Sequence, residues 1–163
     1  SSLVMDRINR IAYMGVSARS DLKLAEIWSE KNDFKLIPFE TSSHTGGPIY
    51  HSDVMMYIGT ELAVVCEDAI TNGKSNVIES LGKTHELMFI SHSQLLNFCG
   101  NCIEVKDDQN RLCLVMSSKA IAGYDDSQKK VLNHFYDRII HSDLETIESH
   151  GGGSARCMIM ELY

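Results

Sequence analysis

The sequence predicts an α/β protein in which a unit of β-β-α-β order recurs roughly every fifty residues. Three observations predict this class: three hairpin-like pairs of apolar runs, a helical pattern after each pair, and another apolar run after each helix. Units of this size bury their apolar faces against their neighbours. We therefore expect them to stack as an array or to close into a ring.

The hairpins each combine a short apolar run, a polar turn and a second apolar run. They are predicted at residues 2–5 with 10–16, 53–58 with 62–66, and 101–105 with 111–116. Their second strands begin near Ile11, Ala63 and Leu112. This spacing defines the repeat.

Helices are predicted after the hairpins at 20–31, 74–84 and 125–140, the first and third behind Asp caps. The third strands of the units are predicted at 34–39, 85–91 and 144–148, with extra helical residues near 93–98. A lone last strand, 157–162, takes the place of a hairpin's first strand. We expect its hairpin partner to come from a segment upstream of Ser1.

Composition bounds the partners and the class of protein. The 163 residues are 44% hydrophobic and 23% charged, as in one ordinary globular domain. Fifteen basic and 22 acidic residues give a net charge of −7, and no basic cluster predicts nucleic-acid binding. No apolar run is long enough to cross a membrane, and the chain opens without a secretory signal. An odd number of cysteines, five, favours a reducing cytoplasm.

Reactive residue types fall at the same place in each unit, just before or at the start of the first hairpin strand. They are His51 and Asp53 in the second unit, Asn101 in the third, and Arg156 and Cys157 at the last. If the units close into a ring, residues at equivalent positions of the units lie on one rim of that ring. Together they would supply a nucleophile, an acid/base and an orienting carboxylate.

Each candidate also has a plainer interpretation. Cys157 follows Gly151-Gly152-Gly153 in a loop that admits close backbone approach, but a cysteine before a strand is also a common apolar filler. His51 and Asp53 share a face of the predicted strand, as a proton shuttle or as a surface pair.

The pair Cys99 and Cys102 has CxxC spacing. Zinc would require a second ligand pair, and a thioredoxin-like motif would open a helix and not a strand. The pair therefore predicts no metal site, and a cysteine-dependent enzyme is expected to need no organic cofactor either.

Residues 48–56 (PIYHSDVMM), 100–105 (GNCIEV), 151–158 (GGGSARCM) and the opening 3–13 resemble the guanidino-group-modifying superfamily. Its members include arginine deiminases, glycine amidinotransferases, dimethylarginine hydrolases and bacterial citrulline-utilising hydrolases. The resemblance implies a pentein fold, a β/α propeller of five ββαβ modules. Three of the five would lie here, at about 1–50, 51–100 and 101–150, as the C-terminal part of a single domain.

By the same resemblance, Cys157 attacks the guanidino or ureido carbon and His51 acts as acid and base. Asp53 binds the guanidinium, while Arg156, Gly152, Gly153 and Asn101 contact the substrate. An arginine- or citrulline-like amino acid is then the partner, and a further acidic residue is expected from an upstream segment of the same protein. A homo-oligomer is compatible with the sequence.

Other readings stay open at this point. The reaction is a hydrolysis or a transfer to an amine. A second hypothesis is a non-catalytic binding module, or an inactive fragment, that retains the fold. A third, Cys/His peptide hydrolysis, fits less well because no oxyanion-hole signature is evident.

Overall fold

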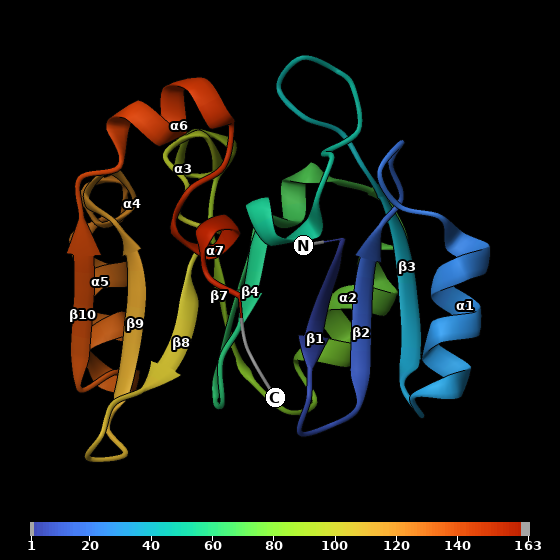
Figure 1. Ribbon diagram of the computed structural model, residues 1–163, viewed down its shortest axis with the longest axis horizontal. Coiled ribbons are helices and arrows are strands. Elements are labelled where there is room, and N and C mark those ends of the chain that lie inside the picture. The colour runs from blue at the N-terminus through green and yellow to red at the C-terminus, as the bar shows by residue number, and fades with distance from the viewer. Residues whose placement is uncertain (1, 161–163) are drawn as a thin grey trace.

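Figure 1 shows the computed structural model, which describes residues 2–160 of the chain. Its strands form three sheets, with the orders β1-β2-β3-β6, β4-β5-β7 and β10-β9-β8. The strands are β1 (Leu3–Asp6), β2 (Ile11–Gly15), β3 (Lys35–Thr41), β4 (Met56–Ile58), β5 (Leu62–Val65), β6 (Ile70–Asn72), β7 (Glu86–Phe89), β8 (Ile103–Lys106), β9 (Leu112–Ser117) and β10 (Arg138–Ser142). The helices are α1 (Leu22–Lys31), α2 (Lys74–Leu81), α3 (His92–Leu96), α4 (Ser118–Gly123), α5 (Asp126–Phe135), α6 (Glu145–Gly151) and α7 (Ala155–Met158), with 3₁₀ turns at Ser52–Val54 and Glu67–Ala69.

The predicted β-β-α-β order is confirmed in all three sheets. In each, an antiparallel hairpin (β1 with β2, β4 with β5, β8 with β9) is extended by a parallel strand (β3, β7 and β10). A helix lies between the second and third strands each time: α1, α2 and α5. The second strands begin at Ile11, Leu62 and Leu112, close to the predicted starts.

The first hairpin strands lie next to one another in the middle of the molecule. Strand β1 contacts β4, and β4 contacts β8. Figure 1 shows these strands at the centre, with α1 and α5 towards the two sides and α7 above the gap between β4 and β8. Residues that precede these central strands are thereby gathered at one end.

Strand β5 of the second sheet lies wholly in the hydrophobic core. All four residues of β5, Leu62–Val65, are fully buried. A strand covered on both faces has an unbroken apolar sequence, as this one does. Because β4 pairs with this buried strand, its position is fixed as well.

Local signals set the helix starts. The Asp21 side chain accepts a hydrogen bond from the Leu24 backbone N–H at 2.9 Å, and Asp125 with Gln128 forms a capping box at the start of α5. Both Asp caps were predicted from the sequence. The extra helix near 93–98 is present as α3.

The third unit differs from its prediction. The helix predicted over 125–140 ends at Phe135, and the third strand is β10, Arg138–Ser142, while the predicted strand 144–148 is replaced by helix α6. Asp137 causes the early stop: its N–H donates to the carbonyl of Leu112, and its carboxylate accepts from the Leu112 N–H, both at 2.9 Å. Pairing with β9 therefore overrides the helical periodicity.

The predicted last strand, 157–162, is wrong where the structure describes it. Ala155–Met158 is the short helix α7, Ile159 and Met160 belong to no strand, and 161–162 lie outside the described residues. Strand β6 and helix α4 were not predicted. Among the described residues, no helix has the length and apolar character that crossing a bilayer requires.

Candidate active site

Asp53 is placed by a turn and not by strand alternation. The hairpin strand predicted from Asp53 begins only at Met56, because Ser52–Val54 forms a 3₁₀ turn. The Ser52 hydroxyl accepts from the Gly15 N–H at 2.8 Å and donates to the Ser2 carbonyl at 2.9 Å. This double contact ties the turn to the first sheet, and Asp53 is left with 2% of its surface exposed.

Asn101 connects three separate segments of the chain. Its side-chain amide nitrogen donates to the Asp53 carbonyl at 2.7 Å and lies 3.2 Å from the Cys157 sulfur. Its side-chain oxygen accepts from the Ser154 N–H at 3.1 Å. Asn101 is fully buried, so it holds the three segments together from inside the protein.

Cys157 lies in α7 with its residue exposed, and its sulfur is 3.9 Å from Oδ2 of Asp53. Gly153 lies directly against it: a Cβ at Gly153 would be 2.9 Å from both Cβ and Sγ of Cys157. Real Cβ atoms essentially never approach other atoms so closely. The last glycine of the run is therefore required for the sulfur to take its present position.

Tyr50 joins the glycine loop to the segment that carries His51. The Tyr50 hydroxyl donates to the Gly152 carbonyl, and Gly152 ends α6 with φ of +70°. The Tyr50 and His51 rings lie 5.0 Å apart. Burial raises the pKa of Tyr50, and the charges of Cys157 and Asp53 add to the rise. The phenol therefore stays protonated and able to donate.

Burial lowers the pKa of His51 below its ordinary value of 6.5, and the charge of Asp53 opposes this shift. The imidazole is consequently neutral at pH 7 and can accept a proton. His51 thus lies within the electrostatic reach of the Asp53 carboxylate, which in turn contacts Cys157.

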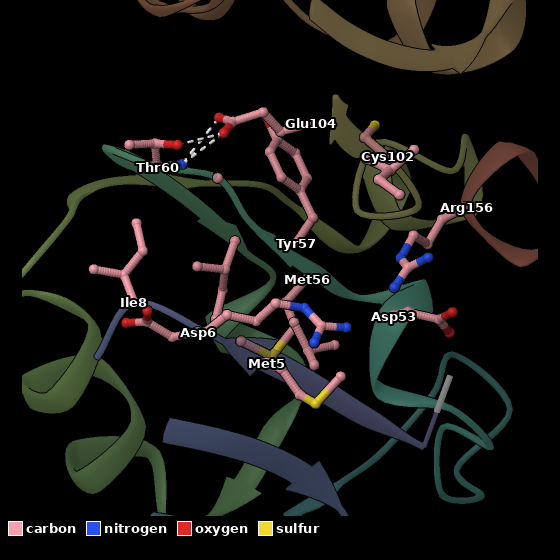
Figure 2. A pocket seen from close by; sticks show the side chains of 15 residues that line it. Met5, Asp6, Ile8, Asp53, Met56, Tyr57, Thr60, Cys102, Glu104 and Arg156 are labelled. Carbon is pink, nitrogen blue, oxygen red and sulfur yellow. Dashed lines mark hydrogen bonds between the residues drawn. The ribbon is translucent and has the colours of Figure 1, made fainter. Parts of the chain in front are cut away.

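A cavity of about 200 Å³ lies between β1, β4 and β8 (Figure 2), and Asp53 lines it, whereas His51, Asn101 and Cys157 do not. Asp53 and Arg156 line one part of it, where Figure 2 shows their side chains close to one another. The Arg156 guanidinium also donates to the Ile159 carbonyl at 3.2 Å. Oδ1 of Asp53 is buried and has no hydrogen-bond partner among the described residues. A buried carboxylate oxygen in this state is suited to a ligand that donates hydrogen bonds.

The structure brings Asp53, Asn101 and Cys157 into direct contact, with Gly153 against the sulfur and Arg156 beside the cavity. Two residues at this site were given no role from the sequence. Ser154 binds Asn101 through its N–H, and its hydroxyl donates to the Glu148 carboxylate at 2.6 Å. The GGGSARC run contains Ser154 as a local signal, but Glu148 was placed in a strand, where no relation to Cys157 could be inferred.

The Cys99 and Cys102 pair takes no part in these contacts, although Cys102 is among the residues that line the cavity. Both are fully buried, with the Cys99 thiol donating to the Ala120 carbonyl and the Cys102 thiol to the Cys99 carbonyl. Burial raises the pKa of Cys99 to about 12 and also raises that of Cys102, so both remain thiols. Within residues 2–160, no group of three His, Cys, Asp or Glu side chains is placed to hold a metal ion.

Comparison with known families gives a match over the whole chain. The model of the eukaryotic N,N dimethylarginine dimethylhydrolase family matches residues 1–163. Among curated proteins, no sequence matches the chain.

Several solved structures have a similar fold. One is the N-terminal domain of ArgZ, an arginine dihydrolase of the ornithine-ammonia cycle in cyanobacteria, solved with its substrate bound. It superposes on this chain with a TM-score of 0.76 at 16% sequence identity, and the match covers 98% of this chain and 54% of that one. AgrE, solved with ornithine and NAD⁺, gives a TM-score of 0.76 at 18% identity, over 98% of this chain and 21% of that one. SxtG, an amidinotransferase of saxitoxin biosynthesis from Microseira wollei, gives 0.63 at 12% identity, over 96% and 44%. At these identities the likeness shows a shared mixed α/β fold, and the chain spans about half the length of the ArgZ domain.

Proposed function

The chain belongs to the N,N dimethylarginine dimethylhydrolase family, and from this premise we propose its reaction. This family and the structural neighbours of the chain are guanidino-modifying hydrolases and transferases. Cys157 attacks the guanidino or ureido carbon of an arginine- or citrulline-like substrate and forms a covalent intermediate. His51 is the acid and base, and Asp53 binds the guanidinium. The observation that carries the proposal is the contact between the sulfur of Cys157, an exposed residue, and the buried Asp53 carboxylate.

The Asp53 carboxylate favours a cationic substrate, although the Arg156 side chain lies beside it (Figure 2). Asp53 is 2% exposed and its Oδ1 has no partner among the residues described. A guanidinium presents planar N–H donors to such a carboxylate and forms charge-assisted hydrogen bonds with it. Bound there, it would place its central carbon near the sulfur, 3.9 Å from the other carboxylate oxygen. Arg156 and the loop at Gly152 and Gly153 would hold the substrate's carboxylate.

In the first half of the reaction, the neutral imidazole of His51 takes the thiol proton of Cys157 as the sulfur bonds to the guanidino carbon. The bond from that carbon to one nitrogen then breaks, and the His51 imidazolium gives its proton to the departing amine. The enzyme is left as a thiouronium-type adduct on Cys157. Burial, which lowers the pKa of His51, supports this assignment because it keeps the imidazole neutral before attack.

In the second half, His51 removes a proton from water, or from an acceptor amine in a transferase. The resulting nucleophile bonds to the same carbon, the carbon–sulfur bond breaks, and Cys157 regains its proton. Hydrolysis of a guanidino group therefore yields a ureido product and a free amine. Neither half of the reaction changes an oxidation state, so the reaction requires no oxidant or reductant.

We propose that the three sheets are three of the five modules of a β/α propeller, at about 1–50, 51–100 and 101–150. Two observations support this arrangement: the repeated strand order and the central position of β1, β4 and β8. Further modules of the same protein would complete the ring and supply a second acidic residue to the substrate. The chain covers 54% of the ArgZ N-terminal domain, which supports a share of three modules in five.

Five free cysteines favour a reducing cytoplasm as the location of the protein.

The test is product analysis on the full-length protein with arginine, dimethylarginine and citrulline as separate substrates. We expect one of them to release its amine, and we expect Cys157→Ser to abolish that release. Cys113→Ser, at a buried cysteine outside the site, is the matched control and should retain activity. A folded protein that binds these compounds without turning any of them over would favour the non-catalytic module instead.

A further inference from the structure

Glu148 is a buried carboxylate that the proposed reaction does not use. It lies in α6 with 8% of its surface exposed, and its Oε1 accepts from the Ser154 hydroxyl at 2.6 Å. Placing a carboxylate in the interior carries a desolvation cost unless hydrogen bonds compensate it. The short bond to the fully buried Ser154 provides that compensation.

Ser154 is bound on both of its polar groups. It precedes α7, where a serine side chain usually accepts from a backbone N–H of the first helical turn, but here it makes no such bond. Its hydroxyl is directed to Glu148, and its N–H donates to Oδ1 of Asn101 at 3.1 Å. Glu148 therefore holds Ser154 in place, and Ser154 in turn holds Asn101.

The amide of Asn101 has one orientation that satisfies all its partners. The Ser154 N–H is a donor and requires the amide oxygen, whereas the Asp53 carbonyl, at 2.7 Å, is an acceptor and requires the amide nitrogen. The same nitrogen then faces the Cys157 sulfur at 3.2 Å. If the amide turned over, its oxygen would face two acceptors.

The backbone of Asn101 adds to this connection, because its carbonyl accepts from the Arg156 N–H at 3.4 Å. Both ends of the Asn101 residue thus hold the segment 154–157. A hydrogen-bond donor fixed against the sulfur holds the sulfur in one position for attack.

We propose that Glu148, acting through Ser154 and Asn101, is a positioning residue that holds the donor edge of the Asn101 amide against the Cys157 sulfur. The inference rests on the proposed role of Cys157 as the nucleophile. Asn101 then positions the Cys157 sulfur and does not contact the substrate.

The experiment follows the rate at which iodoacetamide alkylates Cys157 at pH 7, with the modified residue identified by peptide mapping. We expect Glu148→Leu and Ser154→Ala each to slow alkylation by roughly three- to tenfold, the range that the net contribution of one hydrogen bond gives. The double variant should be no slower than either single one, because both act on the same connection. Glu148→Gln keeps an acceptor oxygen and should restore the rate.

Alkylation does not require turnover, so this result stands apart from the proposed reaction. If no guanidino or ureido compound is consumed, the alkylation rates still test the positioning network. With an active protein, we expect Glu148→Leu to lower kcat and leave KM unchanged.

Thermal unfolding checks that each variant is folded. If Glu148→Leu does not fold, the alkylation rates of Ser154→Ala and Glu148→Gln are compared instead. Ser154→Ala removes a single oxygen atom, and Glu148→Gln retains the hydrogen bond from the Ser154 hydroxyl. Unchanged alkylation in folded Ser154→Ala, or effects of Ser154→Ala and Glu148→Leu that simply add, would overturn the proposal.

Discussion

The sulfur of Cys157 lies 3.9 Å from Oδ2 of Asp53, although 104 positions separate the two residues in the chain. The thiol of an exposed residue thus adjoins a carboxylate that is almost wholly buried. A buried negative charge is stabilised by an opposite charge with hydrogen-bond donors. A guanidinium group supplies both, which is why this pair of residues leads to a substrate of that class.

Asp53→Asn tests the cation site. The amide keeps the shape of the side chain but loses the charge, so we expect kcat/KM for a guanidino substrate to fall roughly ten- to hundredfold, the range for a hydrogen bond between charged groups. A neutral ureido substrate should lose less. Steady-state kinetics with both substrate types measures the difference. Equal losses on the two would mean that Asp53 does not recognise charge.

The pH dependence of kcat/KM tests His51. Burial lowers the pKa of His51, so its imidazole is half protonated only at a pH below the ordinary value of 6.5. The proposed base must be neutral in the free enzyme, so the acid limb of the pH profile is expected to have its midpoint below 6.5. Residual activity of His51→Gln should lack this acid limb. An acid limb with its midpoint above 6.5, or one that survives in His51→Gln, contradicts the assignment.

The glycine run offers a matched pair of substitutions. A Cβ at Gly153 would lie 2.9 Å from Cβ and Sγ of Cys157, whereas a Cβ at Gly151 meets only the Ile147 side chain, at 3.7 Å. We expect Gly153→Ala to displace the sulfur and reduce activity by at least about tenfold, in line with the cost of overpacking. Gly151→Ala should retain activity. The same loss in both variants would show that loop flexibility, and not the space beside Cys157, matters.

Tyr50→Phe removes the hydroxyl that donates to the Gly152 carbonyl and keeps the ring beside His51. The expected loss is about 0.5–1.5 kcal/mol of local stability, the net value of one hydrogen bond. Faster amide hydrogen exchange in residues 151–154, with exchange in β5 unchanged, would demonstrate it. Unchanged exchange in the loop would mean that Tyr50 does not hold the loop.

The repeat and its local signals were predictable because they depend on neighbours in sequence. The apolar run at 62–66 and the Asp21 and Asp125 caps are short-range patterns with direct physical meaning. The segment after Phe135 was not predictable in this way. Its apolar residues continue a helical period, and only the distant contact of Asp137 with Leu112 starts β10 there.

For the site, the repeat predicted that residues before the central strands would converge, and Asp53, Asn101 and Cys157 do meet. The sequence predicted a strand at Cys157, where the chain turns into a helix. The link between Glu148 and Ser154 depends on α6 being helical, so no pattern in the predicted strand could have indicated it.

The central claim is that Cys157 bonds to the carbon of the substrate. Rapid acid quenching of the full-length protein during turnover, followed by mass spectrometry of its peptides, tests this most directly. We predict an adduct that carries the guanidino or ureido carbon on the peptide containing Cys157, and none in Cys157→Ser. Turnover that persists in Cys157→Ser, or an adduct found on another cysteine, would contradict the account.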